Sequence, residues 1–351
     1  MSEKFKNILV TGGAGYVGSL LVPQLLDLGY RVTVYDILFF GDDFLPKTHP
    51  QFNLIQGDIR DSDHFYQACY GIDAVIHLAC ISNDASFELD EALSTSINLT
   101  AFEPVVIAAK KAGVRRFIYA SSSSVYGVSD APEVTEDHPL VPLTLYNKYK
   151  GMCEPLLFKH VDERFTGVVI RPATICGYAP RQRLDLTVNI LTNHAVHTGE
   201  RIDTGTGETI DINGITVLGG GQRRPNLHVQ DMCDLYQLLL TVPKELIARE
   251  IFNVGYQNRS IMDIARIVKN IVEKEFPKKS EIPIRVTETN DIRSYHINSD
   301  KIEKILGFRA KHTIEEAVQD LCSAFRAGKL PNSLTDNCYF NVRQLKALEV
   351  V

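Results

Sequence analysis

Short apolar segments alternate with longer stretches of helical periodicity through the first half of this chain, and this alternation limits the folds it can adopt. The spans between the segments are long enough for helices that cross from one strand to the next. Strands separated by helices form parallel sheets that are covered on both faces. The sequence therefore predicts an α/β fold with a doubly wound parallel sheet. Its strands are expected at Lys6–Thr11, Arg31–Asp36, Phe52–Gln56, Ala74–Leu78, Arg116–Ala120 and Val168–Arg171.

The second half of the chain has a different character. Glycine, proline and arginine crowd together between Cys176 and Arg224. We expect one domain over residues 1–172 and a smaller, mixed α/β domain over residues 173–351 that carries the substrate site. The two should be partly interleaved, because no low-complexity linker separates them. Helical periodicity returns at Asp231–Leu240, Ile261–Glu273 and Ile314–Phe325.

Two segments of the second half lack a clear helical pattern. Gly-rich turns between short apolar pieces over Ile202–Gly221 predict a hairpin or flap. No GK[ST] follows them, so this stretch is not a P-loop. From Pro331 onwards we expect a docked or mobile tail.

The composition excludes several classes of protein. The net charge of −6 argues against a nucleic-acid partner, which usually requires a basic surface. No run of eighteen apolar residues and no secretory leader is present, so we expect a cytoplasmic protein without membrane insertion. The seven cysteines are scattered without CxxC spacing, which favours free thiols and no metal site.

A glycine-rich turn, TGGAGYVG, follows the first expected strand and opens the first expected helix. Gly12, Gly15 and Gly18 suit a turn that is tight, approaches a diphosphate closely and packs a helix against a strand. The helix N-terminus then offers free N–H groups to phosphates. We expect this helix over residues 16–28, with a kink or a late start caused by Pro23.

Asp36 ends the second expected strand, eighteen residues after Gly18. An acid at this position accepts hydrogen bonds from the ribose hydroxyls of NAD. Because its neighbour is Ile37 and not arginine, NAD is favoured over NADP. Asp58 closes the third strand and is either an adenine contact or a plain turn residue.

Tyr146 and Lys150 stand four residues apart and share one face of a helix. A nearby ammonium group favours tyrosinate, so we expect it to lower the phenol pKa from about 10. Such a phenol can exchange a proton with a sugar hydroxyl. The serines at 121–124 follow the fifth strand, at the sheet edge where ligands bind.

Several motifs occur together in one order over roughly residues 6–310. As a set they resemble the extended short-chain dehydrogenase/reductase family, which comprises Rossmann-fold, NAD-dependent nucleotide-sugar epimerases and dehydratases. The motifs are TGGAGYVG, GDIRD with Asp58, His77-Leu78-Ala79, Asn98, ASSSSVYG, Tyr146-x-x-x-Lys150 with Glu154, Arg171-Pro172 and RRPNLHVQD.

The resemblance implies a role for individual residues of this chain. It implies that Ser122, Tyr146 and Lys150 are catalytic, and that the protein is a homodimer. The implied NAD contacts are Gly12, Gly15, Tyr16, Val17, Gly18, Asp36, Asp58, Ile59, Leu78, Ala79, Asn98, Tyr146 and Lys150. The implied nucleotide-sugar contacts are Ser123, Ser124, Thr174, Asn189, Arg224 and Arg293.

Two departures from the family pattern lie in the substrate half. Thr174 stands near a position that is usually asparagine, with Arg181, Arg183 and Asp185 following it, and the 202–221 stretch is longer than usual. The identity of the sugar is therefore the least constrained part of the prediction.

Several reactions are compatible with these residues. A 4,6-dehydratase would need Asp-Glu after the catalytic hydroxyl, where this chain has Ser123 and Ser124. A ketoreductase normally uses NADP, against which Asp36 argues. Epimerisation at carbon 4 through a transient ketone fits best, while a dehydrogenase that releases the ketone remains open. A non-catalytic NAD sensor or scaffold is the alternative from another class.

Overall fold

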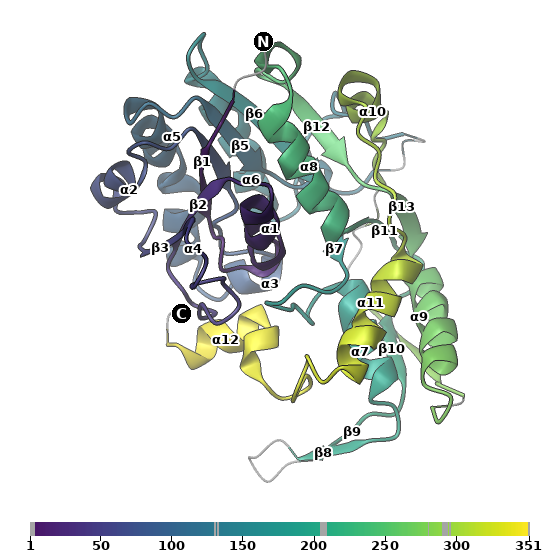
Figure 1. Ribbon diagram of the computed structural model, residues 1–351. Coiled ribbons are helices and arrows are strands. Elements are labelled where there is room, and N and C mark those ends of the chain that lie inside the picture. Colours follow the sequence, from purple (N-terminus) through teal and green to yellow (C-terminus); the bar gives the residue numbers. More distant parts are fainter. Residues whose placement is uncertain are drawn as a thin grey trace.

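The computed structural model describes residues 4–129, 131, 133–203, 209–279, 281–289, 294 and 296–349. A seven-stranded sheet dominates the larger part of the molecule (Figure 1), with the order β12-β6-β5-β4-β1-β2-β3. All neighbouring strands run parallel. The fold is thus the expected α/β Rossmann type. The strands are β1 (Asn7–Thr11), β2 (Arg31–Asp36), β3 (Phe52–Gln56), β4 (Ala74–His77), β5 (Arg116–Ala120), β6 (Thr166–Pro172) and β12 (Ile251–Val254).

The six predicted strands are confirmed within two residues at each end, whereas β12 was not predicted. Its apolar run is only four residues long and is interrupted by Asn253. In the structure Asn253 is fully buried, and its carbonyl Oδ1 accepts a hydrogen bond of 2.7 Å from the Tyr126 hydroxyl. A polar residue satisfied by distant partners leaves no apolar pattern in the sequence.

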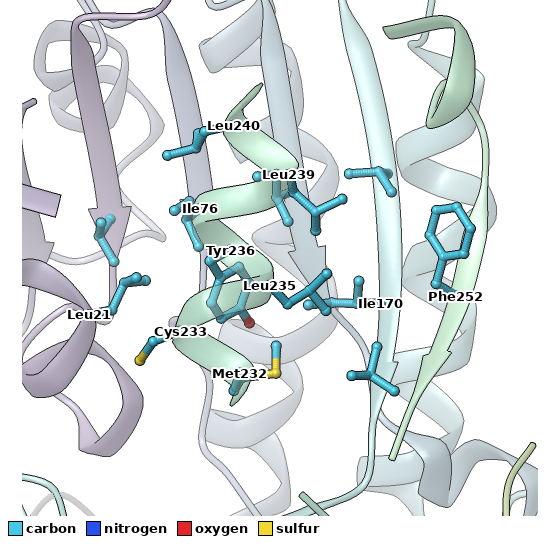
Figure 2. Close-up of a cluster of buried hydrophobic side chains, with 14 of the residues drawn as sticks. Leu21, Ile76, Ile170, Met232, Cys233, Leu235, Tyr236, Leu239, Leu240 and Phe252 are labelled. Atoms are coloured by element: carbon cyan, nitrogen blue, oxygen red, sulfur yellow. The ribbon is translucent and has the colours of Figure 1, made fainter. Parts of the chain in front are cut away.

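Helices cover both faces of the large sheet. One face packs against α1 (Tyr16–Asp27) and α8 (Val229–Thr241), the other against α2 (Ser62–Ala68), α5 (Phe102–Lys111) and α6 (Leu145–Lys159). Figure 2 shows the first face, where α8 lies along the sheet with its apolar side chains turned toward the strands. The side chains labelled there include Ile76, Ile170, Leu235, Leu239 and Phe252.

Helix α1 begins at Tyr16 as predicted and runs without a break to Asp27, so the expectation of a late start is wrong. Pro23 lies inside it and removes one backbone donor. The apolar side chains of Leu21, Val22, Leu25 and Leu26 are buried to at least 97%, and this packing compensates for the lost hydrogen bond.

Short helices connect β4 to α5. They are α3 (Asp84–Phe87), α4 (Glu91–Thr95) and the π-helix η1 (Ser96–Thr100). By length and composition alone, the continuous helical stretch Glu91–Lys111 could cross a membrane, with a mean hydropathy of 1.3. Half of its most apolar window is buried within the protein, where Phe102, Val105 and Val106 belong to the core beneath the sheet. Packing in this core accounts for the apolar character of the stretch.

The second part of the molecule contains three small sheets. They are formed by β7 (Thr174–Cys176), β11 (Arg223–His228) and β13 (Gln257–Ser260), by β10 (Ile215–Leu218) and β14 (Ile284–Thr287), and by β8 (Arg201–Asp203) and β9 (Thr209–Asp211). Strands β8 and β9 pair antiparallel, which confirms a hairpin in the 202–221 stretch, although residues 204–208 lie outside the described residues.

Helices with a shared apolar core pack beside these sheets. The three helical segments predicted in this half are present as α8, α9 and α11. The helices of this part are α7 (Thr187–Val196), α9 (Ile261–Glu275), α10 (Asp300–Leu306) and α11 (Ile314–Arg326). Across the described chain, the short 3-10 helices are η2 (Ser123–Tyr126), which follows β5, and η3 (Lys244–Leu246) and η4 (Asn337–Tyr339) in the second half.

The tail after Pro331 is docked and ends in α12 (Asn341–Ala347). Leu345 is buried in the core beneath the large sheet, and Gln344 Nε2 donates a hydrogen bond of 2.9 Å to the carbonyl of Phe39. Helix α12 therefore packs against elements from the first part of the chain, including α3 (Figure 1).

The chain also returns to the large sheet after residue 172. Strand β12 pairs with β6, and α8 packs on β5, although both follow the small-sheet segments in sequence. The two parts therefore interleave in space. A boundary at residue 172 stays a prediction.

Candidate active site

A cavity of about 440 Å³ opens at the carboxyl ends of β1, β4 and β5. The strand order reverses between β1 and β4, which is where open parallel sheets bind ligands. Sixteen of the predicted site residues line this cavity. They are Gly12, Gly15, Tyr16, Val17, Gly18, Asp36, Asp58, Ile59, Leu78, Ala79, Ser122, Ser124, Tyr146, Lys150, Thr174 and Arg224.

Three predicted contact residues lie behind the cavity wall instead. Both amide atoms of Asn98 bond the backbone of Ile81 at 2.8 Å, which holds the loop after β4. Ser123 is 1% exposed within η2. Asn189 accepts a hydrogen bond from Gly177 N and donates one to the Tyr16 hydroxyl. Asn98 and Asn189 therefore support the walls through the residues that they bond.

Arg293, the remaining predicted substrate contact, lies outside the described residues.

The glycine turn has the shape that a diphosphate requires. Gly12 has φ of +69°, and a Cβ there would stand 2.7 Å from Ala79 N. A Cβ on Gly18 would stand 2.4 Å from Gly13 O. Gly15 caps α1 without any side-chain hydrogen bond, which leaves the first N–H groups of the helix available for an anion. These residues fit the diphosphate of NAD.

Asp36 is held at the end of β2 by backbone donors. Its two carboxylate oxygens accept hydrogen bonds from Ala14 N at 2.9 Å and Leu38 N at 2.8 Å. Burial raises the pKa of Asp36, while these donors oppose the shift. The carboxylate is thereby fixed beside the glycine turn, where the adenosine ribose of NAD would lie.

Asp58 lines the cavity next to Ile59 and pairs with Arg60 at 2.5 Å. Burial opposes the ionised form, but hydrogen bonds from Arg60 outweigh it and lower the pKa of Asp58. The Asp58 carboxylate is therefore already bonded to Arg60 in the same turn.

Helix α6 carries Tyr146 and Lys150 on one face, as predicted. Its N-cap residue, Thr144, accepts a hydrogen bond from Asn147 N and donates one of 2.6 Å to Asp84 Oδ1. Lys150 Nζ donates to the carbonyl of Ala120 at 2.8 Å and lies 5.9 Å from the centre of the Tyr146 ring. The cap and the lysine thus fasten the helix to the end of β5 and to the loop after β4.

A chain of hydroxyls connects the serine segment to the same helix. The hydroxyls of Ser122 and Ser124 lie 2.7 Å apart, and Ser124 Oγ donates to Asn147 Oδ1. Ser122, Tyr146 and Lys150 all line the one cavity. The structure therefore brings together the three residues predicted to be catalytic.

The pKa of Tyr146 differs from our expectation. Burial raises the pKa of Tyr146 well above 10, and electrostatic interactions with Cys80 and Asp84 raise it further. The charge of Arg183 and a backbone hydrogen bond from Asn83 lower it. The prediction that Lys150 depresses this pKa is wrong for this state, because Lys150 Nζ is bonded to Ala120 O and desolvation dominates. The phenol is protonated at neutral pH.

A buried ion pair supports α6 from behind. Arg171 on β6 and Glu154 on α6 meet at 2.6 Å, and each is at least 97% buried. Ser121 Oγ donates to Glu154 at 2.6 Å, and Arg171 donates to the Tyr126 hydroxyl at 2.7 Å. All charges in this network have partners, which is the condition for a buried pair to fix geometry.

His77 and the cysteines near the site have no catalytic geometry. His77 is 4% exposed, shares a hydrogen bond of 2.9 Å with Thr11 Oγ1, and its pKa is lowered to about 3 by burial. Cys80 lines the cavity, whereas Cys176 lies behind it, and burial raises the pKa of the Cys176 thiol. Among the described residues no cluster of His, Cys, Asp or Glu could hold a metal ion.

Sequence reasoning assigned no role to several residues that line the cavity. They come from the loop after β4, the loop after β7 and the C-terminal tail, and short local motifs do not mark them. The one visible signal is the pair of arginines close together in the segment YAPRQRLD. The residues are Ser82, Asn83, Asp84, Arg181, Arg183, Asp185 and Asn341.

Two known relatives match about nine tenths of the chain, well beyond the large sheet. The chain is 26% identical over 330 residues to UDP-glucose 4-epimerase of Bacillus subtilis, covering 89% of this chain and 95% of the relative. It is 28% identical over 339 residues to dTDP-D-glucose 4,6-dehydratase of Mus musculus, covering 92% and 89%.

Solved structures share the fold. UDP-N-acetylglucosamine 4-epimerase from Methanobrevibacter ruminantium, in complex with UDP-N-acetylmuramic acid, superposes with a TM-score of 0.79 at 22% identity, covering 93% of this chain and 99% of that one. The sequence pattern that defines the NAD-dependent epimerase/dehydratase family matches residues 8–255 of this chain. Together with the glycine turn, the reversal in strand order and the Ser122–Tyr146–Lys150 arrangement, this match shows that the chain belongs to the NAD-dependent epimerase/dehydratase family.

Proposed function

We propose that this protein is an NAD-dependent epimerase that inverts carbon 4 of a nucleotide sugar through a transient keto-sugar. The observation that carries the proposal is the convergence of Ser122, Tyr146 and Lys150 on the cavity that the glycine turn opens. Similarity along almost the whole chain to the UDP-glucose 4-epimerase of Bacillus subtilis supports the same reaction.

The residues of the chain divide the work as follows. The Tyr146 phenol exchanges a proton with the sugar hydroxyl, and Ser122 orients that hydroxyl through its own hydrogen bond. Lys150 holds α6 against β5 through Ala120. When bound, NAD would supply the hydride acceptor and donor for the carbon that bears this hydroxyl. The cation Arg183 favours the tyrosinate form that oxidation of the sugar needs.

Proton transfer at the phenol also depends on the shape of the cavity. Three residues that line it, Asp36, Ile81 and Lys150, are held by hydrogen bonds to or from the backbone, which limits their reorganisation when a substrate enters. The substrate must rotate within this cavity before the hydride returns. Side chains from β7, β11 and the loop after β4 form the walls and limit the space that is available for that rotation.

Dehydration fits the site less well than epimerisation. Ser123 and Ser124 follow Ser122 where a dehydratase needs acids, and Ser123 does not reach the cavity. Loss of water from the sugar needs a proton donor of carboxyl strength beside the leaving hydroxyl. The similarity to the mouse 4,6-dehydratase nevertheless makes this the reaction to test against.

The test uses nucleotide sugars carrying deuterium at carbon 4, with UDP, dTDP, GDP and CDP as the nucleotide. Epimerisation predicts an epimer that retains the label at carbon 4. Label at carbon 6 would instead indicate a dehydratase, and a stable ketone with stoichiometric NADH a dehydrogenase. Protein that binds NAD but changes none of these sugars would overturn the enzymatic proposal in favour of an NAD sensor.

A further inference from the structure

Two buried arginines line the cavity from the loop between β7 and α7. Arg181 has no role in the proposed reaction, and Arg183 acts there only through its charge near Tyr146. Arg181 is 2% exposed and Arg183 is 9% exposed. Arginine is among the residues that are almost never buried unless they are paired. Their environment therefore needs an explanation.

Nε of Arg181 and Nη2 of Arg183 are buried and have no hydrogen-bond partner within the described residues. Other nitrogens of the two guanidinium groups are bonded. Arg183 Nε donates to Asp185 Oδ1 at 2.9 Å and its Nη1 to Ser82 Oγ at 3.2 Å. Arg181 Nη2 donates to Asn341 Oδ1 at 2.8 Å.

The two arginines differ in their partners. Asp185 pairs with Arg183, but no ion pair joins Arg181 to a carboxylate in the described part of the chain. Arg181 instead lies over the ring of Phe40, 3.7 Å from its centre. Burial and the neighbouring Arg183 lower the pKa of Arg181 to about 9, although the carboxylates of Asp185 and Asp36 oppose this shift. A bound anion would supply the hydrogen-bond partners that the buried guanidinium nitrogens lack.

The position of this loop suggests which anion it meets. The backbone N–H of Arg181 donates to Ser19 Oγ at 3.0 Å, so the loop is fastened to the helix that the glycine turn opens. Arg183 reaches Ser82 in the loop after β4. The arginines thus border the same groove as Gly15 and Asp36. A planar guanidinium group with free N–H donors suits the oxygens of a phosphate.

We propose that Arg181 and Arg183 form a diphosphate-binding site that complements the glycine turn, with Asn341 of the C-terminal tail positioning Arg181. The proposal rests on the assignment of the cavity to NAD and a nucleotide sugar, both of which carry a diphosphate. The attachment to Ser19 favours the diphosphate of NAD. Removing NAD before the measurement allows binding of the NAD diphosphate to be distinguished from binding of the nucleotide-sugar diphosphate.

The experiment measures the affinity of cofactor-free protein for NAD, for UDP and for adenosine by calorimetry. The variants are R181Q and R183Q. The matched control is R266Q, because Arg266 is an exposed arginine on α9 that pairs with Asp263. Loss of a charge-assisted hydrogen bond should weaken the affinity for the diphosphate ligand roughly ten- to hundredfold. Adenosine affinity should not change, and R266Q should bind all three probes as the unmodified protein does.

Loss confined to NAD assigns the site to the cofactor, and loss confined to UDP assigns it to the substrate; both support a diphosphate site. Unchanged affinity for NAD and UDP in R181Q and R183Q would overturn it. An equal loss of adenosine affinity would do the same, because it would show a structural role. No turnover is measured, so failure of the epimerase proposal would leave this result interpretable.

The positioning role of Asn341 has its own readout. N341A keeps both guanidinium groups but removes the acceptor of Arg181 Nη2. It should reproduce the R181Q loss of diphosphate affinity only in part, with the affinity for adenosine unchanged. A diphosphate affinity equal to that of the unmodified protein would overturn the role of Asn341.

Discussion

The two ends of the cavity are built in different ways. At the glycine-turn end the requirements are steric and local, since a Cβ on Gly12 or Gly18 would collide with backbone atoms. At the Tyr146 end the properties of the phenol depend on burial and on groups far away in sequence, including Asp84 and Arg183. Local geometry can be recognised in a sequence motif, whereas the electrostatics of a buried group depends on the whole fold.

The largest expected effect distinguishes chemistry from binding at the Tyr146 end. Tyr146→Phe removes the proton-transfer group and retains the ring, so turnover should fall roughly 10²- to 10⁴-fold. NAD affinity should stay the same, because the glycine turn is untouched. Turnover assays and NAD titration check this. A parallel loss of NAD affinity would count against a purely proton-transferring role and weaken the contrast between the two ends.

A steric substitution sharpens the description of the opposite end. In Gly18→Ala the new Cβ would meet Gly13 O at 2.4 Å, so stability should drop by about 1–3 kcal/mol and NAD affinity should fall. Gly221→Ala is the matched control, since a Cβ there meets nothing within 4 Å. Urea unfolding measures both variants. Equal stabilities would show that the turn tolerates side chains after all.

The glycine-turn end also has a pH dependence, which comes from His77 beneath it. The folded-state pKa of about 3 lies below the unfolded value of about 6.5. The unfolded chain therefore binds a proton that the native state excludes. The contribution of His77 is complete above pH 6.5 and falls by about 1.4 kcal/mol per pH unit as the pH drops toward 3.

Between pH 7 and 5, the native protein should thus lose about 2 kcal/mol that His77→Gln does not lose. Chemical denaturation at the two pH values tests the difference. The variant itself is less stable at pH 7 because the contact with Thr11 changes, so only the pH-dependent part is diagnostic. The same pH-dependent loss in both proteins would contradict burial of a neutral imidazole.

The smallest effect tests whether a remote charge tunes the phenol. Asp84 raises the pKa of Tyr146, so Asp84→Asn should move the limb of the kcat/KM profile for sugar oxidation to lower pH. The hydrogen bond from Thr144 can persist to the amide oxygen. Asp63→Asn, an exposed change on α2, should leave the profile in place. A shift in both variants would point to a general charge effect.

Much of the fold was predictable because it depends on periodicity. Six strands and the helices α1, α8, α9 and α11 follow apolar patterns that their own residues carry. Strand β12 was missed since Asn253 is stabilised by partners from other segments. The docking of the tail could not be predicted, because Asn341 and Gln344 form their contacts with loops far away in sequence.

The candidate site shows the same difference between features with a local sequence pattern and features that depend on distant contacts. The glycine turn, Asp36 and the Tyr146–Lys150 pair are each recognisable from a short spacing. Asn98 and Asn189 were predicted as ligand contacts, but they bond the backbone and side chains of the wall, a distinction that spacing does not carry. The protonation state of Tyr146 was mispredicted because desolvation depends on packing that a helix-face argument omits.

Strand β12 has a consequence for how the molecule can move. It is contributed by the later part of the chain but hydrogen-bonds along β6, which carries Arg171 and leads into the substrate half. A hinge that opened the two parts as rigid bodies would have to break this edge of the sheet. Access to the cavity should therefore rely on rearrangement of loops, and thermal unfolding should proceed as one cooperative transition instead of two.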